Sequence, residues 1–436
     1  MIPIVAYRDR RERLRAILDR RATFSPDVDA AVREIVDAVQ RRGDEALLEY
    51  THRFDGVRPE RIVVPEETLE AAYARMDPEL RAIVATAADN IRRFHAQQRR
   101  PSWFTDDGDG VVLGQRVLPI ERVGLYVPGG KAFYPSSLLM NAIPAQEAGV
   151  EEIHLVSPPG PEGLPHALVL ATAHFLGLRR VYAVGGAQAV AALAYGTASV
   201  PAVDKIVGPG NAFVQAAKKM VYGPVDIDAL AGPSEIVVLA DDTADPVFVA
   251  ADMLSQAEHD ERASAILVTP DPRLAAAVRE QIEAMVPQLP RHTIIEASLR
   301  DYGACVVTET LEQAVAMTNE LAPEHLELIV REPWELMTRI RHAGAVFLGP
   351  YSSEPVGDYF AGPNHVLPTG GTARYASALG VDDFVRRQSI IAYTGERLRR
   401  TGPDIVKFAE AEELTAHAKA IQVRLDRASP DGGAKG

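Results

Sequence analysis

The chain has 436 residues, of which 47% are hydrophobic and 24% are charged, an ordinary composition for a soluble globular protein of about two or three domains. Its formal net charge of −14 argues against nucleic acid and anionic membranes as general partners. Cys305 is the only cysteine, which excludes an intrachain disulfide and a thiolate zinc finger, and its apolar setting predicts an inert buried thiol.

Neither the N-terminus nor any internal run has the character of a membrane segment. The start, MIPIVAYRDRRERLR, is charged too early for a secretory signal. Residues 181–203 are uncharged and long enough to span a bilayer, but they are rich in Ala and Gly and are interrupted by polar residues and Pro201. We therefore expect a cytoplasmic protein with no membrane partner.

The first hundred or so residues are mostly helical by their pattern. Ser25 and Pro26 form a typical helix start, as cap and first residue. Residues 77–97 carry apolar side chains at helical spacing. We expect a helical N-terminal extension over residues 1–24, followed by the first α/β domain.

Short apolar runs alternate with helical segments from residue 121 onward. A first series of strand–helix pairs begins at 124, and a second series of similar order and spacing begins at 235. This alternation predicts an α/β fold with two Rossmann-like parallel-sheet units, and the similarity of the two series indicates an internal duplication. We expect one domain from residues 25–125 together with 234–380, and a second domain over 126–233.

The remaining residues, 381–436, are expected to form a C-terminal helical extension. A short segment with a basic pair, Arg386 and Arg387, precedes a single predicted helix from Val406 to about Leu425. Residues 429–436, SPDGGAKG, are typical of a disordered tail.

Three polar clusters carry the candidate chemistry. Residues 355–376 contain Asp358, His365 and so many glycines and prolines that the pattern predicts a long ordered loop instead of a helix. The other two clusters are 255–260, SQAEHD, and 322–328, APEHLEL. A carboxylate and an imidazole on a loop shaped by Gly and Pro indicate a functional site more than a solvated connector.

The cluster at 255–260 has the spacing of a metal site. Gln256 and His259 are three apart on a predicted helix, so they share a face and can grip one ion. On ligand chemistry alone, Glu258 or Asp260 is the better partner for His259, because amide ligands to zinc are uncommon. A solvated helix end is the simpler interpretation of the same residues.

The pair Glu324 and His325 offers two proton-transfer groups side by side, between a predicted helix and an apolar strand. Histidine titrates near neutrality, which suits a base that must take up and release a proton. The alternative is a capped helix end followed by an amphipathic strand. Glu412 and His417 lie five apart in the last predicted helix, for which a charged surface helix is the simpler interpretation.

Three glycine turns follow apolar runs, at Gly129-Gly130, Gly185-Gly186 and Gly208-Pro209-Gly210. Backbone amides at such turns can receive an anion. None of them completes the dinucleotide fingerprint, and no acidic residue stands in the position that contacts the ribose. The motifs alone therefore do not establish the use of a nicotinamide cofactor.

Taken together, these segments resemble the histidinol dehydrogenase family. The matching stretches include GLYVPGGKAFYPSSLLM at 124–140, KIVGPGNAFVQAAKK at 205–219, DMLSQAEHD at 252–260, LAPEHLEL at 321–328 and VGDYFAGPNHVLPTGGTARYAS at 356–377. These motifs are long and unusual, the resemblance covers nearly the whole chain, and no functional position departs from the family's pattern.

The resemblance implies an NAD-dependent enzyme that oxidises L-histidinol through histidinaldehyde to L-histidine, the final step of histidine biosynthesis, with one zinc ion per subunit. It implies that the catalytic residues are Glu324 and His325, and that the metal ligands are Gln256, His259, Asp358 and His417. Substrate contacts would come from Ser234, Gln256, His259, His325, Asp358, His365, Glu412 and His417, and NAD contacts from Tyr126, Gln188 and Asn211.

The resemblance also implies an intertwined homodimer, in which the C-terminal extension carries His417 into the partner's site. The domain with residues 25–125 and 234–380 would hold the metal and the catalytic pair, and residues 126–233 would bind NAD. Other functions stay open from the residues alone: a zinc hydrolase, a non-catalytic binding protein on the same scaffold, or a related dehydrogenase acting on another amino alcohol.

Overall fold

The structure is a computed structural model that describes residues 2–18, 26–129 and 134–428. The chain divides into two compact units, one made of Met1–Gln98 with Ile120–Phe384 and the other of Arg99–Pro119 with Val385–Gly436. The first unit contains two parallel sheets, and the second contains an antiparallel sheet and a pair of helices.

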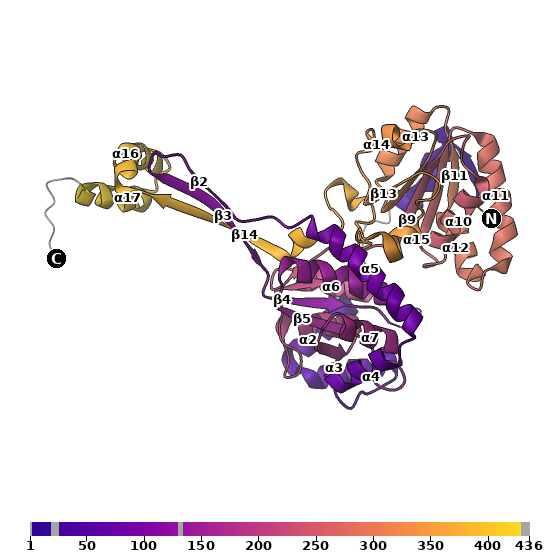
Figure 1. Cartoon of the computed structure of the whole chain (residues 1–436), viewed down its shortest axis with the longest axis horizontal. Helices are drawn as coiled ribbons and strands as arrows, with labels where there is room; N and C mark the ends of the chain where they lie inside the picture. The colour runs from indigo at the N-terminus through magenta and orange to yellow at the C-terminus, as the bar shows by residue number, and fades with distance from the viewer. Residues whose placement is uncertain (1, 19–25, 130–133, 429–436) are drawn as a thin grey trace. The chain divides into compact units, whose positions relative to one another are not determined.

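The first sheet has six parallel strands in the order β1-β11-β10-β9-β12-β13. Figure 1 labels β9, β11 and β13 of this sheet. Their bounds are Ile4–Ala6, Ala304–Val307, Ser264–Thr269, Glu235–Ala240, His325–Ile329 and Ala345–Leu348. All six residues of β9 are buried, as expected for a central parallel strand covered on both faces. The sequence predicted a helical extension over residues 1–24, so the strand β1 was not expected.

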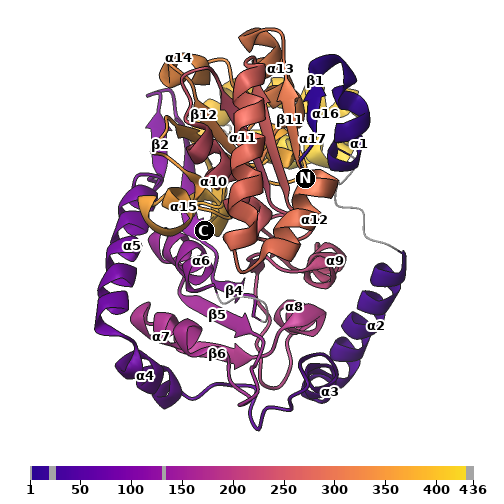
Figure 2. The same cartoon turned by 90° about the vertical axis from the view of Figure 1, so that its right-hand side faces the viewer.

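Successive residues of β9 face opposite layers of helices. Ile236 and Val238 pack with α10 (Pro246–Ala257), α11 (Pro272–Met285) and α12 (His292–Tyr302), which lie together in Figure 2. Val237 and Leu239 pack instead with α1 (Arg10–Leu18), α13 (Leu311–Leu321) and α14 (Pro333–Met337). Cys305 lies in β11 on the first of these faces, and burial raises the pKa of its thiol to about 12.

The second sheet has five parallel strands in the order β6-β5-β4-β7-β8. Their bounds are Arg180–Ala183, Glu152–Ser157, Arg122–Tyr126, Lys205–Val207 and Asp226–Ile227. One face packs on α2 (Pro26–Arg42), α3 (Asp44–Asp55), α8 (Gly186–Tyr195) and α9 (Ala212–Val221). The other packs on α4 (Glu66–Arg75), α5 (Pro78–Ala96), α6 (Pro135–Ala148) and α7 (Ala167–Phe175).

The predicted alternation of strands and helices is confirmed in both series, because each predicted strand and helix core from residue 124 to 348 is present. Several helix starts follow local chemistry: Asp77, Asp245 and Asp271 each cap a helix that has Pro at its first position. Pro26 opens α2 as predicted, whereas Ser25 lies outside the described residues, as does the 429–436 tail.

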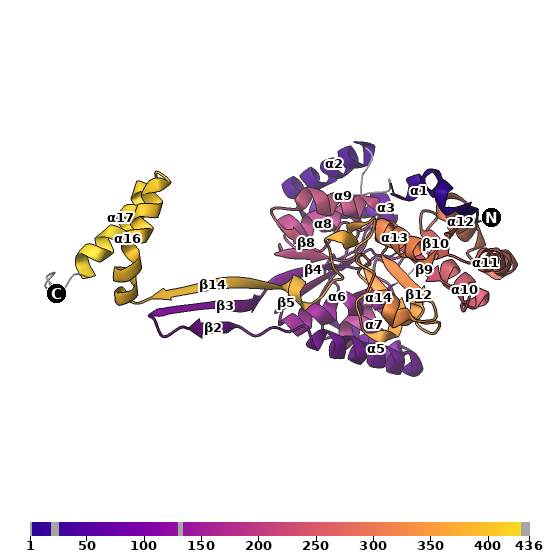
Figure 3. The ribbon, with the colours of Figure 1, turned by 90° about the horizontal axis from the view of Figure 1, so that it is seen from above.

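The second unit differs from the sequence-based prediction in two ways. The segment with Arg386 and Arg387 is a strand, β14 (Val385–Tyr393), which pairs antiparallel with β3 (Val111–Pro119), itself paired with β2 (Trp103–Asp106) (Figure 3). The single predicted final helix is two helices, α16 (Gly395–Ala411) and α17 (Thr415–Ala428). Glu413 between them has a φ of 61°, which interrupts the helical path.

The duplication, and domain boundaries at residues 24, 125, 233 and 380, stay predictions. The uncharged run 181–203 consists of the end of β6, the helix α8 and the segments next to them. Within the described parts of the chain, no helix combines the length and the apolar character that crossing a membrane requires.

Candidate active site

The three polar clusters meet at the amino ends of two strands of the first sheet. The helix α10 starts after β9 and runs back along the sheet, so its last turn, with Gln256, returns to the edge where β9 and β12 begin. His325 is the first residue of β12, and its Nδ1 atom lies 3.1 Å from Oε1 of Gln256. Asp358 approaches from the 355–376 segment, with Oδ1 4.0 Å from Nε2 of His325.

The segment with Asp358 is partly helical, unlike the loop that its composition predicts. Glu354–Val356 form a short helix, α15, which continues into a π-helical turn, η3, over Gly357–Ala361. The chain is irregular after Gly362 until a further 3₁₀ turn at Thr372–Arg374. Pro355 is accommodated because it stands in the first turn of α15, where its missing N–H costs no hydrogen bond.

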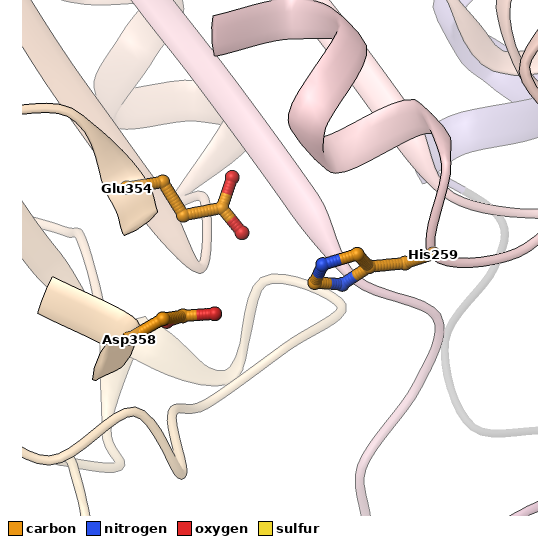
Figure 4. A group of neighbouring side chains, drawn as sticks. All are labelled: His259, Glu354 and Asp358. Atoms are coloured by element: carbon orange, nitrogen blue, oxygen red, sulfur yellow. The ribbon is translucent and has the colours of Figure 1, made fainter. Parts of the chain in front are cut away.

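Three side chains form a group that can hold a metal ion. His259, Glu354 and Asp358 each offer a ligand atom, and these atoms lie within 4.8 Å of one another. Figure 4 shows the imidazole and the two carboxylates directed toward a common space. The Gln256 amide adjoins the group, with Nε2 3.4 Å from Nδ1 of His259. Imidazole and carboxylate donors fit zinc.

Glu354 is a member of this group that the sequence analysis missed. Its side chain is 1% exposed, Ser255 Oγ donates to its Oε2 at 3.4 Å, and its Oε1 has no partner among the described residues. Burial raises the pKa of this carboxyl well above its ordinary value. The available signal was its spacing, since Glu354 precedes Asp358 by four residues, the separation that places two side chains on one helical face.

The two acids preferred on ligand chemistry, Glu258 and Asp260, do not belong to the group. Glu258 forms the C-terminal cap of α10, and Asp260 Oδ1 accepts the N–H of Arg262 in a local turn. The acids near His259 come instead from the distant 354–358 segment, which sequence spacing around His259 does not reveal.

The hydrogen bonds of His325 assign its protons. Nδ1 lies 3.0 Å from the carbonyl oxygen of Glu235 and 3.1 Å from Oε1 of Gln256. Both partners accept, so Nδ1 carries the hydrogen and Nε2 keeps its lone pair. Nε2 is buried and has no hydrogen-bond partner in the described part of the chain, and burial lowers the pKa of this imidazole to about 4. His325 is therefore a neutral base whose free nitrogen faces the Asp358 side.

Glu324 is held by the neighbouring strand. Its Oε2 accepts the backbone N–H of Glu235 at 2.9 Å, directly after Ser234, so Ser234 lies at the same edge. Burial raises the pKa of the Glu324 carboxyl well above its ordinary value. The chain reaches this position through Ala322, which ends α13 with a φ of 49°, a left-handed conformation that is uncommon outside glycine.

His365 connects the site to the helix α6. Its Nδ1 lies 3.1 Å from the carbonyl oxygen of Asp358, and its Nε2 lies 3.2 Å from Oγ of Ser137. The carbonyl can only accept, so Nδ1 donates to it and Nε2 accepts from the hydroxyl. Glu412 and His417, in contrast, belong to the second unit, where both are exposed, at the end of α16 and in α17.

The three candidate NAD contacts gather at the carboxyl edge of the second sheet. Tyr126 ends β4, and its hydroxyl accepts the N–H of Gly186, the first residue of α8. Gln188 lies in the first turn of α8 and is 1% exposed, with Oε1 lacking a partner among the described residues. Asn211 caps α9 through its side chain. Helix N-termini at this edge are where α/β proteins bind phosphates.

Comparison with known proteins agrees with this architecture. The model of the family described as "Histidinol dehydrogenase" matches residues 18–425. The chain belongs to the histidinol dehydrogenase family. It is 57% identical over 396 residues to the histidinol dehydrogenase of Halalkalibacterium halodurans, covering 91% of this chain and 93% of the relative. The histidinol dehydrogenase of Geobacillus kaustophilus is 56% identical, over 95% of this chain and 99% of its own.

The fold matches as well. The crystal structure of histidinol dehydrogenase from Elizabethkingia anophelis aligns with a TM-score of 0.89 at 40% identity, covering 93% of each chain. The match to the histidinol dehydrogenase family, from residue 18 to 425, includes the second parallel sheet and every strand of the first except β1. It also includes the antiparallel strands and α16 of the second unit. The predicted α/β class and the predicted family are thus confirmed.

Proposed function

We propose that the protein oxidises L-histidinol through histidinaldehyde to L-histidine, using NAD and one zinc ion per subunit. The observation that carries this proposal is His325, a buried neutral imidazole with a free Nε2, placed between the buried Glu324 and the His259–Glu354–Asp358 group. A base, a second proton acceptor and a cation site beside one another are what two successive alcohol and aldehyde oxidations need.

In this proposal Gln256, His259 and Asp358 bind the metal, and His417 from the partner subunit completes the set. The donor chemistry supports this, because these side chains offer an imidazole, a carboxylate and an amide to one space. Bound zinc would orient the substrate through its imidazole and amino nitrogens. Gln256 can turn its oxygen toward the cation because Nδ1 of His325 retains the Glu235 carbonyl as acceptor.

The first oxidation needs a base at the hydroxyl group of the alcohol. Bound NAD would accept the hydride from the alcohol carbon. His325 Nε2 takes the hydroxyl proton as that hydride leaves, so a C=O bond forms and the aldehyde results. Its Nδ1–H bond to the Glu235 carbonyl holds the ring in place and supports the imidazolium that forms.

The second oxidation starts with hydration of the aldehyde. Glu324 removes a proton from the attacking water, and the raised pKa of its buried carboxyl makes its carboxylate a stronger base than an exposed one. After His325 has released its first proton to solvent, it accepts a hydroxyl proton of the hydrate as the second hydride leaves, which a second NAD would accept, and the carboxylate product results. Ser234, His365 and Glu412 are proposed to contact the substrate, and the enclosure of Glu324 and His325 favours retention of the reactive aldehyde.

We also propose a cytoplasmic homodimer with shared active sites. The second unit supports this, because it exposes large apolar side chains: Phe104 is 57% exposed, Phe408 69% and Ile391 72%. Such residues on one small unit are typical of a surface that is covered by another chain. The same unit carries Glu412 and His417, which the proposal assigns to the partner's site.

The test is an assay of the purified protein with L-histidinol and NAD, with and without a zinc chelator. We expect about two NADH per histidine formed, and loss of activity with chelator that added zinc restores. Chelator-sensitive cleavage of a substrate without reduction of NAD would instead indicate a zinc hydrolase. Binding without any turnover would indicate a binding protein, and faster turnover of another amino alcohol a related dehydrogenase.

A further inference from the structure

Glu327 is a buried acid that the proposed mechanism does not use. It is the third residue of β12, two after His325, so the two side chains lie on the same face of the strand. Its neighbours on the adjoining strands are Val238 in β9 and Phe347 in β13, and Glu327 itself is 1% exposed. A carboxyl among apolar side chains costs free energy unless hydrogen bonds replace its contacts with water. The partners of this carboxyl therefore indicate its role.

One oxygen of Glu327 holds the start of α15. Its Oε1 accepts the backbone N–H of Glu354, the first residue of this helix, at 2.8 Å. The first N–H groups of a helix have no acceptor within the helix, and the side chain of the preceding residue, Ser353, forms no capping hydrogen bond. Glu327 thus acts as a cap from a distant segment. It fixes the helix with Glu354 to the strand that carries His325.

The Glu327 carboxyl also contacts the helix α10. Its Oε2 meets no N–H or hydroxyl donor among the described residues, and the group within hydrogen-bonding reach of this carboxyl is the carboxyl of Asp252. Two carboxyls can bond to one another only when one of them carries a proton. Burial raises the pKa of both. Asp252 stands four residues before Gln256 on α10, so this pair lies along the same contact of α10 with β12 that joins Gln256 to His325.

A close packing contact seats the same segment on the neighbouring strand. Gly357 lies against the ring of Phe347 in β13, and a Cβ atom at this glycine would lie 2.7 Å from Cε1 of the ring. Figure 4 shows the two carboxylates of the segment, Glu354 and Asp358, extending from one side toward the His259 imidazole. The place of both carboxylates therefore depends on how this segment is held on β12 and β13.

We propose that Glu327 positions the candidate metal group by holding the N–H of Glu354, which fixes the 354–358 segment against the strand of His325. Zinc binding at that group belongs to the proposed function, on which this role rests. Glu327 lies outside the group of ligand atoms and acts through the backbone of Glu354. A purely structural contact would change the stability of the protein, whereas a positioning contact also changes its affinity for zinc.

The experiment compares Glu327→Gln with Glu327→Met in the purified full-length protein. Glutamine keeps an oxygen for the Glu354 N–H and offers an N–H to Asp252, whereas methionine fills a similar volume without either hydrogen bond. Competition with a fluorescent chelator measures the zinc affinity of the metal-free proteins, and urea unfolding measures their stability. We expect zinc affinity to fall about tenfold or more in Glu327→Met and to stay within about threefold of wild type in Glu327→Gln.

Leu328→Val is the matched control. Leu328 is the next residue of β12 and packs with the opposite layer of helices, so this variant should lose stability without losing zinc affinity. In steady-state kinetics with zinc in excess, Glu327→Met should lower kcat/KM for L-histidinol about tenfold or more, because the bound substrate would be displaced from Nε2 of His325. Glu327→Gln should keep most of that activity.

The outcomes separate this role from the proposed function. Equal zinc affinities of wild type and folded Glu327→Met would overturn the positioning role and leave the proposed oxidation standing. Equal losses in Glu327→Gln and Glu327→Met would also overturn it, because the hydrogen bond to Glu354 would then not be decisive. If Glu327→Met does not fold, Glu327→Asp takes its place, since its carboxyl lies one carbon farther from the Glu354 N–H, and unchanged zinc affinity would again contradict the role. A wild type that neither binds zinc nor oxidises histidinol would refute the proposed function, and this role with it.

Discussion

Nδ1 of His325 lies 3.1 Å from Oε1 of Gln256, and this contact joins the candidate base to the candidate metal group. The Gln256 amide also reaches His259, at 3.4 Å from its Nδ1. One buried amide therefore lies between the residue that would move protons and a residue that would hold the cation. Because the Glu235 carbonyl gives Nδ1 a second acceptor, the free Nε2 does not depend on how Gln256 is oriented.

Replacing this base should slow both oxidations. In His325→Asn we expect kcat to fall about 10²- to 10⁴-fold with L-histidinol and with histidinaldehyde, because the proton acceptor is lost from each step. Steady-state kinetics with each substrate measure the effect. The control is His52→Asn, at an exposed histidine of α3, which should leave kcat unchanged. A variant that keeps full activity would remove His325 from the mechanism.

The lowered pKa of His325 also predicts a change in acid stability. Its folded-state pKa of about 4 lies below the ordinary value of 6.5, so between these values the unfolded chain binds more protons. The stabilising contribution of His325 is fully present above pH 6.5, and it is lost as the pH falls from 6.5 to about 4. Metal-free His325→Asn should therefore lose less unfolding free energy than metal-free wild type between about pH 7 and about pH 5.

Urea unfolding at several pH values measures that difference. The buried carboxyl of Glu324 has a raised pKa and acts with the opposite sign, since its contribution is present at low pH and is lost as pH rises. Wild type and His325→Asn both contain Glu324, so its contribution cancels to first order when their stabilities are compared. Parallel stability profiles of the two proteins would show that His325 is not a buried neutral imidazole.

Changing Glu324 should separate the two oxidations. Glu324→Gln keeps an oxygen that can accept the Glu235 N–H, so the local fold should persist, but it removes the carboxylate that activates water. We expect aldehyde oxidation to fall about 10²-fold or more, with alcohol oxidation reduced much less. Single-turnover NADH formation from each substrate tests this, and an equal loss in both would contradict the role.

The sequence predicted the two parallel sheets well because buried parallel strands are continuous apolar runs. Strand β9, EIVVLA, and strand β10, SAILVT, are buried at every position. Strands β3 and β14 carry mixed, partly exposed residues and pair across more than 260 residues of sequence, Val385 with Pro119, so no local signal marks them. The antiparallel sheet of the second unit was missed for this reason.

The candidate site likewise combines residues that a local sequence signal marks with residues that no local signal marks. Glu324 and His325 are adjacent and stand at a visible helix–strand boundary, so their cooperation could be inferred. Their location differs from the usual pattern of α/β proteins, since they lie at the amino ends of the strands. Glu354 was missed because His259 and Ser255, which lie beside it, come from another segment, and a single sequence does not show which segments meet.

Glu354 should strengthen metal binding. Its carboxyl lies with His259 and Asp358 around one space, and a bound cation would favour its ionised form. Glu354→Gln has the same shape without the charge, so zinc affinity should fall about 10- to 100-fold. Competition with a fluorescent chelator measures this without reference to activity. Glu258→Gln is the control, because Glu258 caps α10 outside the group, and equal affinities in both variants would exclude Glu354.

Mixing two inactive variants tests whether His417 serves the partner's site. His259→Ala and His417→Ala should each be inactive alone, because each removes a proposed zinc ligand. In a heterodimer that shares sites, one site receives both lesions and the other receives neither, so denaturing and refolding an equal mixture should restore about a quarter of wild-type activity. If His417 acts within its own subunit, every site keeps one lesion and the mixture stays inactive. Mixing His259→Ala with Gln256→Ala is the matched control. Both residues are proposed to act in their own subunit's site, so each site of the mixed dimer keeps one lesion and no activity should return.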